Sequence, residues 1–255
     1  MCIILYHEPG ARVSDEVLTT CWRNNPDGGG IMWADGGRVH VSKGYMTLPD
    51  FIRAYRDVPE RAPMVAHMRI GTSGGYGPEV THPYPITSDL DALHALDVEC
   101  SEGIAHNGVL PYPSDDKRGI SDTVAFIMGE VAPLERSRRV RRAGGIVRSR
   151  YAIGKLKADS EGSRLAILSA DGAIKLTGAG WQGVTRGVQA SNASWRGVKT
   201  WALYSTPFDG CDDWGDLEEW GYGDGIADEL EAFHGCAGCE MLDTCRRTGY
   251  FCFDL

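Results

Sequence analysis

Short apolar segments separated by glycine-rich turns recur along most of the chain, and they constrain the fold more than any other feature. Residues 2–6 read Cys-Ile-Ile-Leu-Tyr, and comparable segments follow at 29–34, 38–44, 63–71 and 103–110. Apolar runs of this length, bounded by glycine-rich turns, are typical of β-strands. The pattern therefore predicts several short strands joined by tight turns.

Segments with helical periodicity lie between these predicted strands. In residues 48–58 the apolar side chains recur at helical spacing, and residues 121–132 are predicted to form a helix capped by Ser121 or Asp122. Residues 163–178 carry the signal of a β-hairpin, because an Asp-Gly pair lies at their centre. The sequence itself therefore predicts a mixed α/β chain.

The length and the cysteine content limit which classes of protein the chain can belong to. A chain of 255 residues can bury one large core, or one core with a small appendage. No apolar run approaches the ~20 residues of a membrane helix, and no basic region precedes the short apolar run at the N-terminus. We therefore expect a cytoplasmic protein with no membrane partner. In that compartment eight cysteines favour metal binding or catalysis over disulfides, and the isolated Cys21, Cys100 and Cys211 are expected to be ordinary thiols.

The formal net charge of −9 comes from one segment near the C-terminus. Residues 209–231 hold ten Asp or Glu and no Lys or Arg, so the rest of the chain is close to neutral. Overall charge therefore gives no argument for nucleic-acid binding, so we do not expect a nucleic-acid partner, although the charge does not exclude one. The change in composition predicts a folded domain over 1–203, an acidic linker over 204–233 and a small tail over 234–255.

Cys2 follows the first methionine directly, and this position allows two interpretations. Methionine aminopeptidases remove Met1 when the next side chain is small, which would leave Cys2 with a free α-amine. An α-amine has a pKa of about 8 and can take the thiol proton, so one residue would supply both nucleophile and base. In the other interpretation Cys2 is a buried thiol that packs as a small hydrophobic residue. Position alone favours the second interpretation.

Five further motifs follow Cys2 along the chain. They are His67-Met68-Arg69, Thr72-Ser73-Gly74, His82-Pro83, His106-Asn107-Gly108 and Asp122 ahead of a helix. Taken singly, each also fits an ordinary turn, salt bridge or helix cap. Taken in this order after Cys2, the set resembles the class II glutamine amidotransferases, which are N-terminal-nucleophile hydrolases. The glycine-rich residues 24–33 and the later segments 163–172 and 187–195 are also similar, so the resemblance covers residues 2–203.

The resemblance implies a fold and a reaction for the domain over residues 1–203. The fold would be α+β, a four-layer αββα sandwich of the N-terminal-nucleophile hydrolase type with a small cysteine-rich tail. The reaction would be hydrolysis of L-glutamine to glutamate and ammonia through a γ-glutamyl thioester on Cys2, with no cofactor. Attack on the amide creates an oxyanion that needs fixed hydrogen-bond donors. The resemblance assigns this role to Asn107 and Gly108.

The resemblance also implies how glutamine would be held. Arg69 would clamp its α-carboxylate through a bidentate pair, and Asp122 would pair with its α-ammonium. Thr72 and His106 complete the expected substrate site.

Two positions depart from the family pattern. Ser73 stands where the synthetases of this family often have histidine, and Val80-Thr81 precede His82-Pro83 where Asn-Ala is usual. These departures affect the glutamine pocket and leave the nucleophile and oxyanion donors intact. We expect the site histidines to support the structure rather than transfer protons, because the α-amine fills that role; they are His67, His82 and His106.

Four cysteines lie close together in the tail, in the pattern C-x2-C-x5-C-x6-C. Four thiolates can complete a tetrahedral set around Zn²⁺, and a [4Fe–4S] cluster takes the same ligands. His234 is near enough in sequence to replace one of them. We expect zinc, with an iron–sulfur cluster or unligated cysteines as alternatives. The predicted ligands are Cys236, Cys239, Cys245 and Cys252.

Residues 135–150 are strongly basic and contain no aromatic side chain. They could bind an anionic partner such as tRNA, DNA or a nucleotide, or they could form a solvated helix face opposed by the chain's own acidic segment. Without interleaved aromatic residues, nothing in this stretch favours stacking on single-stranded bases.

The expected partners follow from the resemblance. About 50 residues remain after residue 203, too few for an enzyme that accepts ammonia, so we expect a synthase or synthetase on a separate chain to receive it. Two alternatives stay open. One is an N-terminal-nucleophile amidase for another γ-glutamyl or acyl amide. The other is a non-catalytic, metal-bearing binding protein of the same fold.

Overall fold

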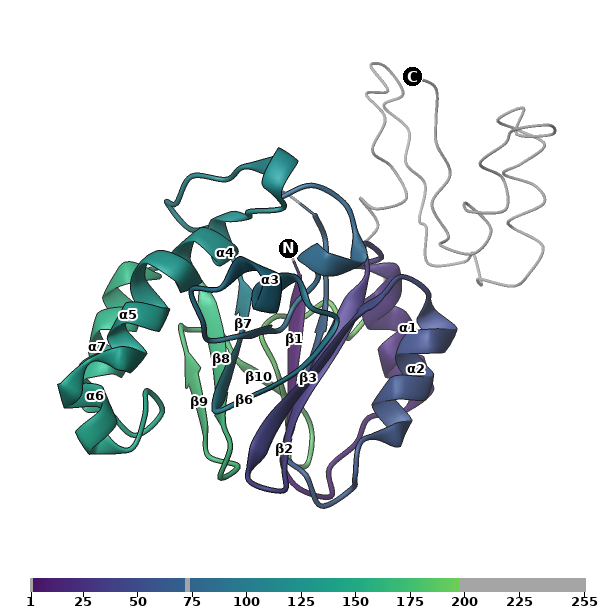
Figure 1. The fold of residues 1–255 in the computed structure, drawn as a ribbon. Helices are drawn as coiled ribbons and strands as arrows, with labels where there is room; N and C mark the ends of the chain where they lie inside the picture. Colours follow the sequence, from purple (N-terminus) through teal and green to yellow (C-terminus); the bar gives the residue numbers. More distant parts are fainter. Residues whose placement is uncertain (1, 72–73, 198–255) are drawn as a thin grey trace, which may run out of the picture. The chain divides into compact units, whose positions relative to one another are not determined.

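The structure is a computed structural model that describes residues 2–71 and 74–197 (Figure 1). Within these residues the chain forms two antiparallel β-sheets with helices on their outer sides. The expected mixture of helices and strands is therefore confirmed as α+β. The domain limits predicted at residues 203 and 233 lie outside the described residues.

The larger sheet has seven strands in the order β10-β11-β1-β4-β2-β3-β6. β1 pairs with β11 on one side and with β4 on the other, so this apolar strand has no free edge. The strands are β1 Ile3–His7, β2 Gly29–Asp35, β3 Arg38–Tyr45, β4 Met64–Met68, β6 Asp97–Cys100, β10 Gln182–Thr185 and β11 Val188–Ala190.

The smaller sheet has four strands in the order β5-β7-β8-β9. β7 and β8 pair along six residues, from Glu102 opposite Ser169 to Asn107 opposite Arg164. The turn between β8 and β9 contains Gly172 at φ 82°, a conformation that glycine adopts without strain. The strands are β5 Tyr84–Pro85, β7 Glu102–Asn107, β8 Arg164–Ser169 and β9 Ile174–Thr177.

The helices α2, α3, α4, α6 and α7 each begin after a residue whose side chain accepts a hydrogen bond from a backbone N–H of the first turn. Ser121 starts α4 by accepting a hydrogen bond from Val124 N at 3.2 Å, as an N-cap serine does. No helix in the described part of the chain is both long and apolar enough to cross a membrane. The helices are α1 Asp15–Arg23, α2 Leu48–Asp57, α3 Leu90–His94, α4 Asp122–Phe126, α5 Ala132–Arg136, α6 Arg138–Ala143 and α7 Arg150–Asp159, with a π-helical stretch Ile127–Val131 and 3₁₀ turns at Pro78–Val80 and Asp116–Arg118.

Three hydrophobic clusters hold these elements together. The first packs α1 and α2 against the seven-stranded sheet, the second fills the space between the sheets, and the third packs the helices from α4 to α7 against the four-stranded sheet (Figure 1). Representative members of the three clusters, in that order, are Trp22 and Phe51, then Met32 and Leu168, then Phe126 and Leu156.

β1 is buried on both of its faces. Ile3 and Leu5 belong to the cluster beneath α1 and α2, whereas Ile4 and Tyr6 belong to the cluster between the sheets. Successive side chains of a strand point to opposite faces, so a strand covered on both sides must be apolar throughout. This explains the unbroken apolar run that follows Cys2.

Most predicted segments form the expected elements, and several others were not predicted. The strands and helices expected within residues 2–195 are present as β1, β2, β3, α2, β4, β7, α4, β8, β9 and β11. The sequence analysis missed α1, although its buried Leu18, Cys21 and Trp22 have helical spacing. It also missed β6, whose exposed and partly buried residues alternate at the edge of the sheet.

Replacing Phe51 tests the packing of α2 on the larger sheet. Its ring is 0% exposed and its centroid lies 5.5 Å from that of Trp22. We expect Phe51→Ala to lower the free energy of unfolding by about 3–5 kcal/mol, measured by urea denaturation, because it leaves a cavity. Met46→Ala, at a side chain that is 43% exposed, should change it by less than about 0.5 kcal/mol. Equal losses in both variants would contradict this packing.

Candidate active site

Cys2 lies at the start of β1, beside the end of β4. Ile3 pairs with Met68, and continuing this antiparallel register places Cys2 opposite Arg69. The N–H of Ile70 donates a hydrogen bond to Cys2 Sγ at 3.4 Å. On its other side, Asn192 Nδ2 donates to the Cys2 carbonyl oxygen at 2.7 Å. The thiol is therefore held between the end of β4 and the segment that follows β11.

The surroundings of Cys2 keep its thiol protonated near neutral pH. Burial raises the pKa of the Cys2 thiol, while the hydrogen bond from Ile70 and the nearby Arg69 charge lower it. Because burial dominates, the thiol needs a base to become a nucleophile.

Arg69 is a nearly buried cation fixed by its own backbone. It is 4% exposed, its N–H donates to Gly28 O at 2.8 Å, and its carbonyl oxygen accepts from Asp27 N at 3.0 Å. The guanidinium donates from Nη2 to Gly75 O at 3.0 Å and lies 5.8 Å from the Tyr76 ring. The guanidinium of Arg69 is therefore restricted in its orientation, and its positive charge lies on the side of the sheet that carries Cys2.

Asn107 ends β7 and reaches across to the larger sheet. Its Nδ2 donates to Ser191 Oγ at 2.8 Å, and the same oxygen accepts from Ile4 N at 2.9 Å. Ser191 precedes Asn192, the residue that holds Cys2. Ser191 therefore connects Asn107, the predicted oxyanion donor, with β1, the strand that follows the predicted nucleophile. The Asn107 amide retains a second N–H that can donate to a substrate.

Gly108 follows at a position that only glycine fits. Its φ is 152°, and a Cβ there would lie 2.2 Å from Ser163 Oγ. Among the described residues, no hydrogen-bond acceptor is recorded for its N–H. The backbone N–H of Gly108 and the side chain of Asn107 thus place two neighbouring donors at the end of β7.

Asp122 is the first residue of α4 and holds the loop after β7. Its Oδ2 accepts from Leu110 N at 2.8 Å and its Oδ1 accepts from Thr123 N at 2.7 Å. The hydroxyl of Thr123 lies 2.8 Å from Nδ1 of His106, which connects the His-Asn-Gly turn to the same helix. A carboxylate at this position is favoured by the N–H donors of the first helical turn.

The three predicted site histidines form a buried group. The ring centroids of His67 and His82 are 4.4 Å apart, and His67 Nε2 lies 3.0 Å from the carbonyl oxygen of His106. Burial lowers the pKa of His67 to about 3 and that of His106 to about 4, and it holds the pKa of His82 well below its usual value. All three rings are therefore neutral at pH 7, and the supporting role expected for them stays a prediction.

Several predicted site residues lie outside the described part of the chain. They are Thr72 and the four tail cysteines Cys236, Cys239, Cys245 and Cys252. Within residues 2–71 and 74–197, no group of three or more His, Cys, Asp or Glu side chains is placed to hold a metal ion. The predictions of a zinc or iron–sulfur site in the tail therefore stay predictions.

Three residues that contact the site were not singled out from the sequence. Asn192 and Ser191 lie in a segment that was predicted only as a strand and turn, yet they bind the Cys2 carbonyl and the Asn107 amide. Their signal is faint, since short polar residues after a buried strand are typical of any turn. Asp27 is a third such residue, because its Oδ2 accepts from Gly71 N at 2.7 Å.

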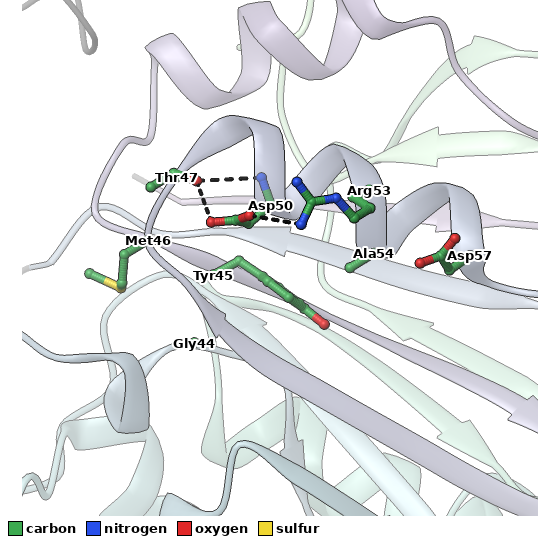
Figure 2. Close-up of a pocket in the computed structure, with 8 residues that line it drawn as sticks. All are labelled: Gly44, Tyr45, Met46, Thr47, Asp50, Arg53, Ala54 and Asp57. Atoms are coloured by element: carbon green, nitrogen blue, oxygen red, sulfur yellow. Dashed lines mark hydrogen bonds and ion pairs between the residues drawn. The ribbon is translucent and has the colours of Figure 1, made fainter.

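Two surface hollows lie along α2, apart from this group of residues. One measures about 430 Å³ (Figure 2), and Asp50 there accepts hydrogen bonds from Thr47 Oγ1 at 2.7 Å and Arg53 at 3.3 Å. The other measures about 450 Å³ and shares Arg53 and Asp57 with the first. None of the predicted site residues lines either hollow.

No protein-family model matches the chain, and a search of the curated proteins finds no match. The function is therefore argued from the residues and their geometry.

The pH dependence of thiol alkylation tests the environment of Cys2. In a chain kept blocked ahead of Cys2 by an N-terminal tag, iodoacetamide should react with a midpoint above the ordinary thiol pKa of about 8.5, because burial disfavours the thiolate. In a chain that begins at Cys2, the adjacent α-ammonium should shift the midpoint to lower pH. Peptide mass mapping follows the modification.

Cys21 is the internal control for this measurement. It is 0% exposed, and burial raises the pKa of its thiol to about 12, so it should stay unmodified in the folded protein. A midpoint at or below about 8.5 in the blocked chain would contradict the account of Cys2.

Proposed function

We propose that the chain is a glutaminase of the class II glutamine amidotransferase type, with Cys2 as its nucleophile once Met1 is removed. The observation that carries the proposal is the convergence of Cys2, Arg69 and Asn107, which come from three separate segments. Cys2 lies opposite Arg69 in the sheet register, and Ser191 connects the β1 strand to Asn107. The three residues, which the ordered set of sequence motifs singles out together, are thus linked through β1, and this linkage supports the proposal.

The proposed reaction uses the two functional groups of Cys2. Its α-amine takes the thiol proton, and Sγ attacks the side-chain carboxamide carbon of glutamine. The oxyanion that forms would accept hydrogen bonds from Asn107 and from the N–H of Gly108. Collapse of this intermediate breaks the C–N bond, and the departing nitrogen takes a proton and leaves as ammonia. Water then hydrolyses the γ-glutamyl thioester, which releases glutamate and restores the thiol.

Arg69 and Asp122 supply the charges that a free amino acid requires. A nearly buried guanidinium suits the α-carboxylate, because paired N–H···O bonds are strong where water is scarce. The carboxylate of Asp122 suits the α-ammonium, and Thr72 would add hydrogen bonds to the substrate. His106 supports Asp122 through Thr123.

The arrangement of the layers supports the proposal at the level of fold. Helices, the seven-stranded sheet, the four-stranded sheet and further helices follow one another, as the three hydrophobic clusters indicate. This is the order of the αββα sandwich that the N-terminal-nucleophile hydrolases would require. A fold hosts many functions, so the site residues carry the argument and the fold adds to it.

The remaining parts of the proposal concern partners and the tail. A synthase or synthetase on a separate chain would receive the ammonia in the cytoplasm. Zn²⁺ would occupy the four tail cysteines in a structural site, with an iron–sulfur cluster as the second candidate. An amidase for another γ-glutamyl or acyl amide remains the second candidate function, since only Arg69 and Asp122 favour a free amino acid.

Replacement of Cys2 tests the proposed reaction. The purified full chain should begin at Cys2 by intact mass, should form glutamate and ammonia from L-glutamine, and should be labelled at Cys2 by diazo-oxo-norleucine. Cys2→Ala should abolish hydrolysis and labelling, because no other group replaces the nucleophile. Cys100→Ala is the matched control, since Cys100 is also a free, partly buried thiol, and it should keep full activity.

Two outcomes would contradict the proposal. One is a chain that begins at Cys2 and neither hydrolyses glutamine nor reacts with the analogue, which would favour a non-catalytic binding protein. The other is a Cys2→Ala variant as active as the original.

Arg69→Lys tests the recognition of the α-carboxylate. Lysine keeps the charge and loses the bidentate geometry, so KM for glutamine should rise about tenfold, with a smaller change in kcat. L-Glutamine α-amide, which lacks the carboxylate, should show little difference between the variant and the original. Arg61→Lys, at an exposed ion pair with Asp35, is the control and should leave KM unchanged. An unchanged KM in Arg69→Lys would remove Arg69 from the substrate site.

A further inference from the structure

Seven exposed arginines form a strongly basic surface around α6, which we call the arginine face. Residues 136–150 contain these seven arginines and no Asp, Glu or Lys. Figure 1 shows α6 at the outer edge of the helices that cover the four-stranded sheet, well away from the start of β1. The arginine face consists of Arg136, Arg138, Arg139, Arg141, Arg142, Arg148 and Arg150.

The geometry of α6 directs its arginines outward. Val140, at 0% exposure, is the one buried residue of the helix and anchors it to the core. Since successive residues turn by about 100°, Arg138 and Arg142 lie on the side opposite Val140, one turn apart. Like charges at this spacing repel each other, so folding alone gives no reason to place them there.

Within the described residues, a carboxylate pairs with one of the seven arginines of this face. Arg148 pairs with Asp171, and Arg136 donates to Ser88 Oγ at 3.0 Å. No ion pair is recorded between a described carboxylate and the arginines of α6. Elsewhere on the described surface, Arg53, Arg56 and Arg61 each pair with an aspartate, whereas no ion pair is recorded for the isolated Arg38 and Arg186.

An exposed aromatic ring adjoins the arginine face. Tyr151 in the first turn of α7 is 43% exposed, and Arg139 Cζ lies 4.2 Å from the centroid of its ring. The sequence analysis found no aromatic residue within 135–150, and Tyr151 is the next residue of the chain. The helix packing thus brings an aromatic surface beside the arginines.

We propose that the arginine face binds the phosphodiester backbone of a nucleic acid. Guanidinium groups donate paired hydrogen bonds to phosphate oxygens, and the face uses arginine without a single lysine. Arginines on successive helical turns can each contact a different phosphate of a nucleic-acid backbone. An isolated anion offers a single charged group and cannot be contacted in this way. The exposed ring of Tyr151 favours nucleic acid over an acidic protein, because a base can stack on it. This activity is independent of the chemistry at Cys2.

Fluorescence anisotropy with the full chain tests the proposal. The probes are a labelled single-stranded DNA and RNA of about 20 nucleotides, which exceeds a typical single-strand site, and a duplex DNA of the same length. At least one probe should bind saturably. If four phosphates are neutralised, raising the salt from about 50 to 200 mM should weaken binding about fifty-fold for a single strand and about 150-fold for the duplex. Comparison of the three probes identifies the form of nucleic acid that is bound.

Charge reversal on α6 supplies the matched variants. Arg138→Glu with Arg142→Glu should weaken binding at least tenfold, and Arg138→Gln with Arg142→Gln, which is milder for the helix, at least threefold. The control is Arg38→Glu with Arg186→Glu, two exposed arginines elsewhere that change the net charge equally. It should weaken binding less than twofold.

Three results would overturn the proposal. They are no saturable binding of any probe at the lower salt, equal losses in the α6 variants and the control, and displacement of the probe by poly-L-glutamate as effectively as by unlabelled nucleic acid. The last result would assign the face to an acidic protein.

Discussion

The antiparallel pairing of β1 with β4 is the constraint on which the candidate site depends. Five residues of β1 pair in register with five residues of β4, and side chains from both faces of β1 are buried. A slip of one residue would turn Ile3 and Leu5 toward the second sheet and Ile4 and Tyr6 toward α1 and α2. Packing on both faces therefore fixes the register, and the register places Cys2 opposite Arg69.

The second sheet adds the remaining groups through a few polar contacts. Ser191 receives hydrogen bonds from Asn107 and from the backbone of Ile4, so it joins the two sheets at the end where Cys2 lies. His67 on β4 adds a further connection to the carbonyl oxygen of His106. These groups are buried and polar, and each would cost free energy if its partner were lost. The same contacts that join the sheets therefore also position the candidate site.

The sequence predicted the strands that carry the site and the residues at their ends, because apolar runs, glycine turns and short motifs are local signals. Contacts between distant segments were not predictable in this way. Asn192 binds the Cys2 carbonyl across 190 positions of sequence. Lys43 is another example, since it is 3% exposed and lies 3.9 Å from the Tyr84 ring, although it occurs in an ordinary strand pattern. Such environments depend on the packing of the whole fold, which no local pattern encodes.

The central claim is that Cys2 carries the γ-glutamyl group during hydrolysis, and trapping that intermediate tests it most directly. The full chain would be mixed with isotope-labelled L-glutamine, quenched in acid within the first turnover and digested for peptide mass spectrometry. The account predicts a labelled γ-glutamyl thioester on the peptide that begins with Cys2. Release of labelled glutamate with no adduct at Cys2, or with the adduct on another cysteine, would contradict it.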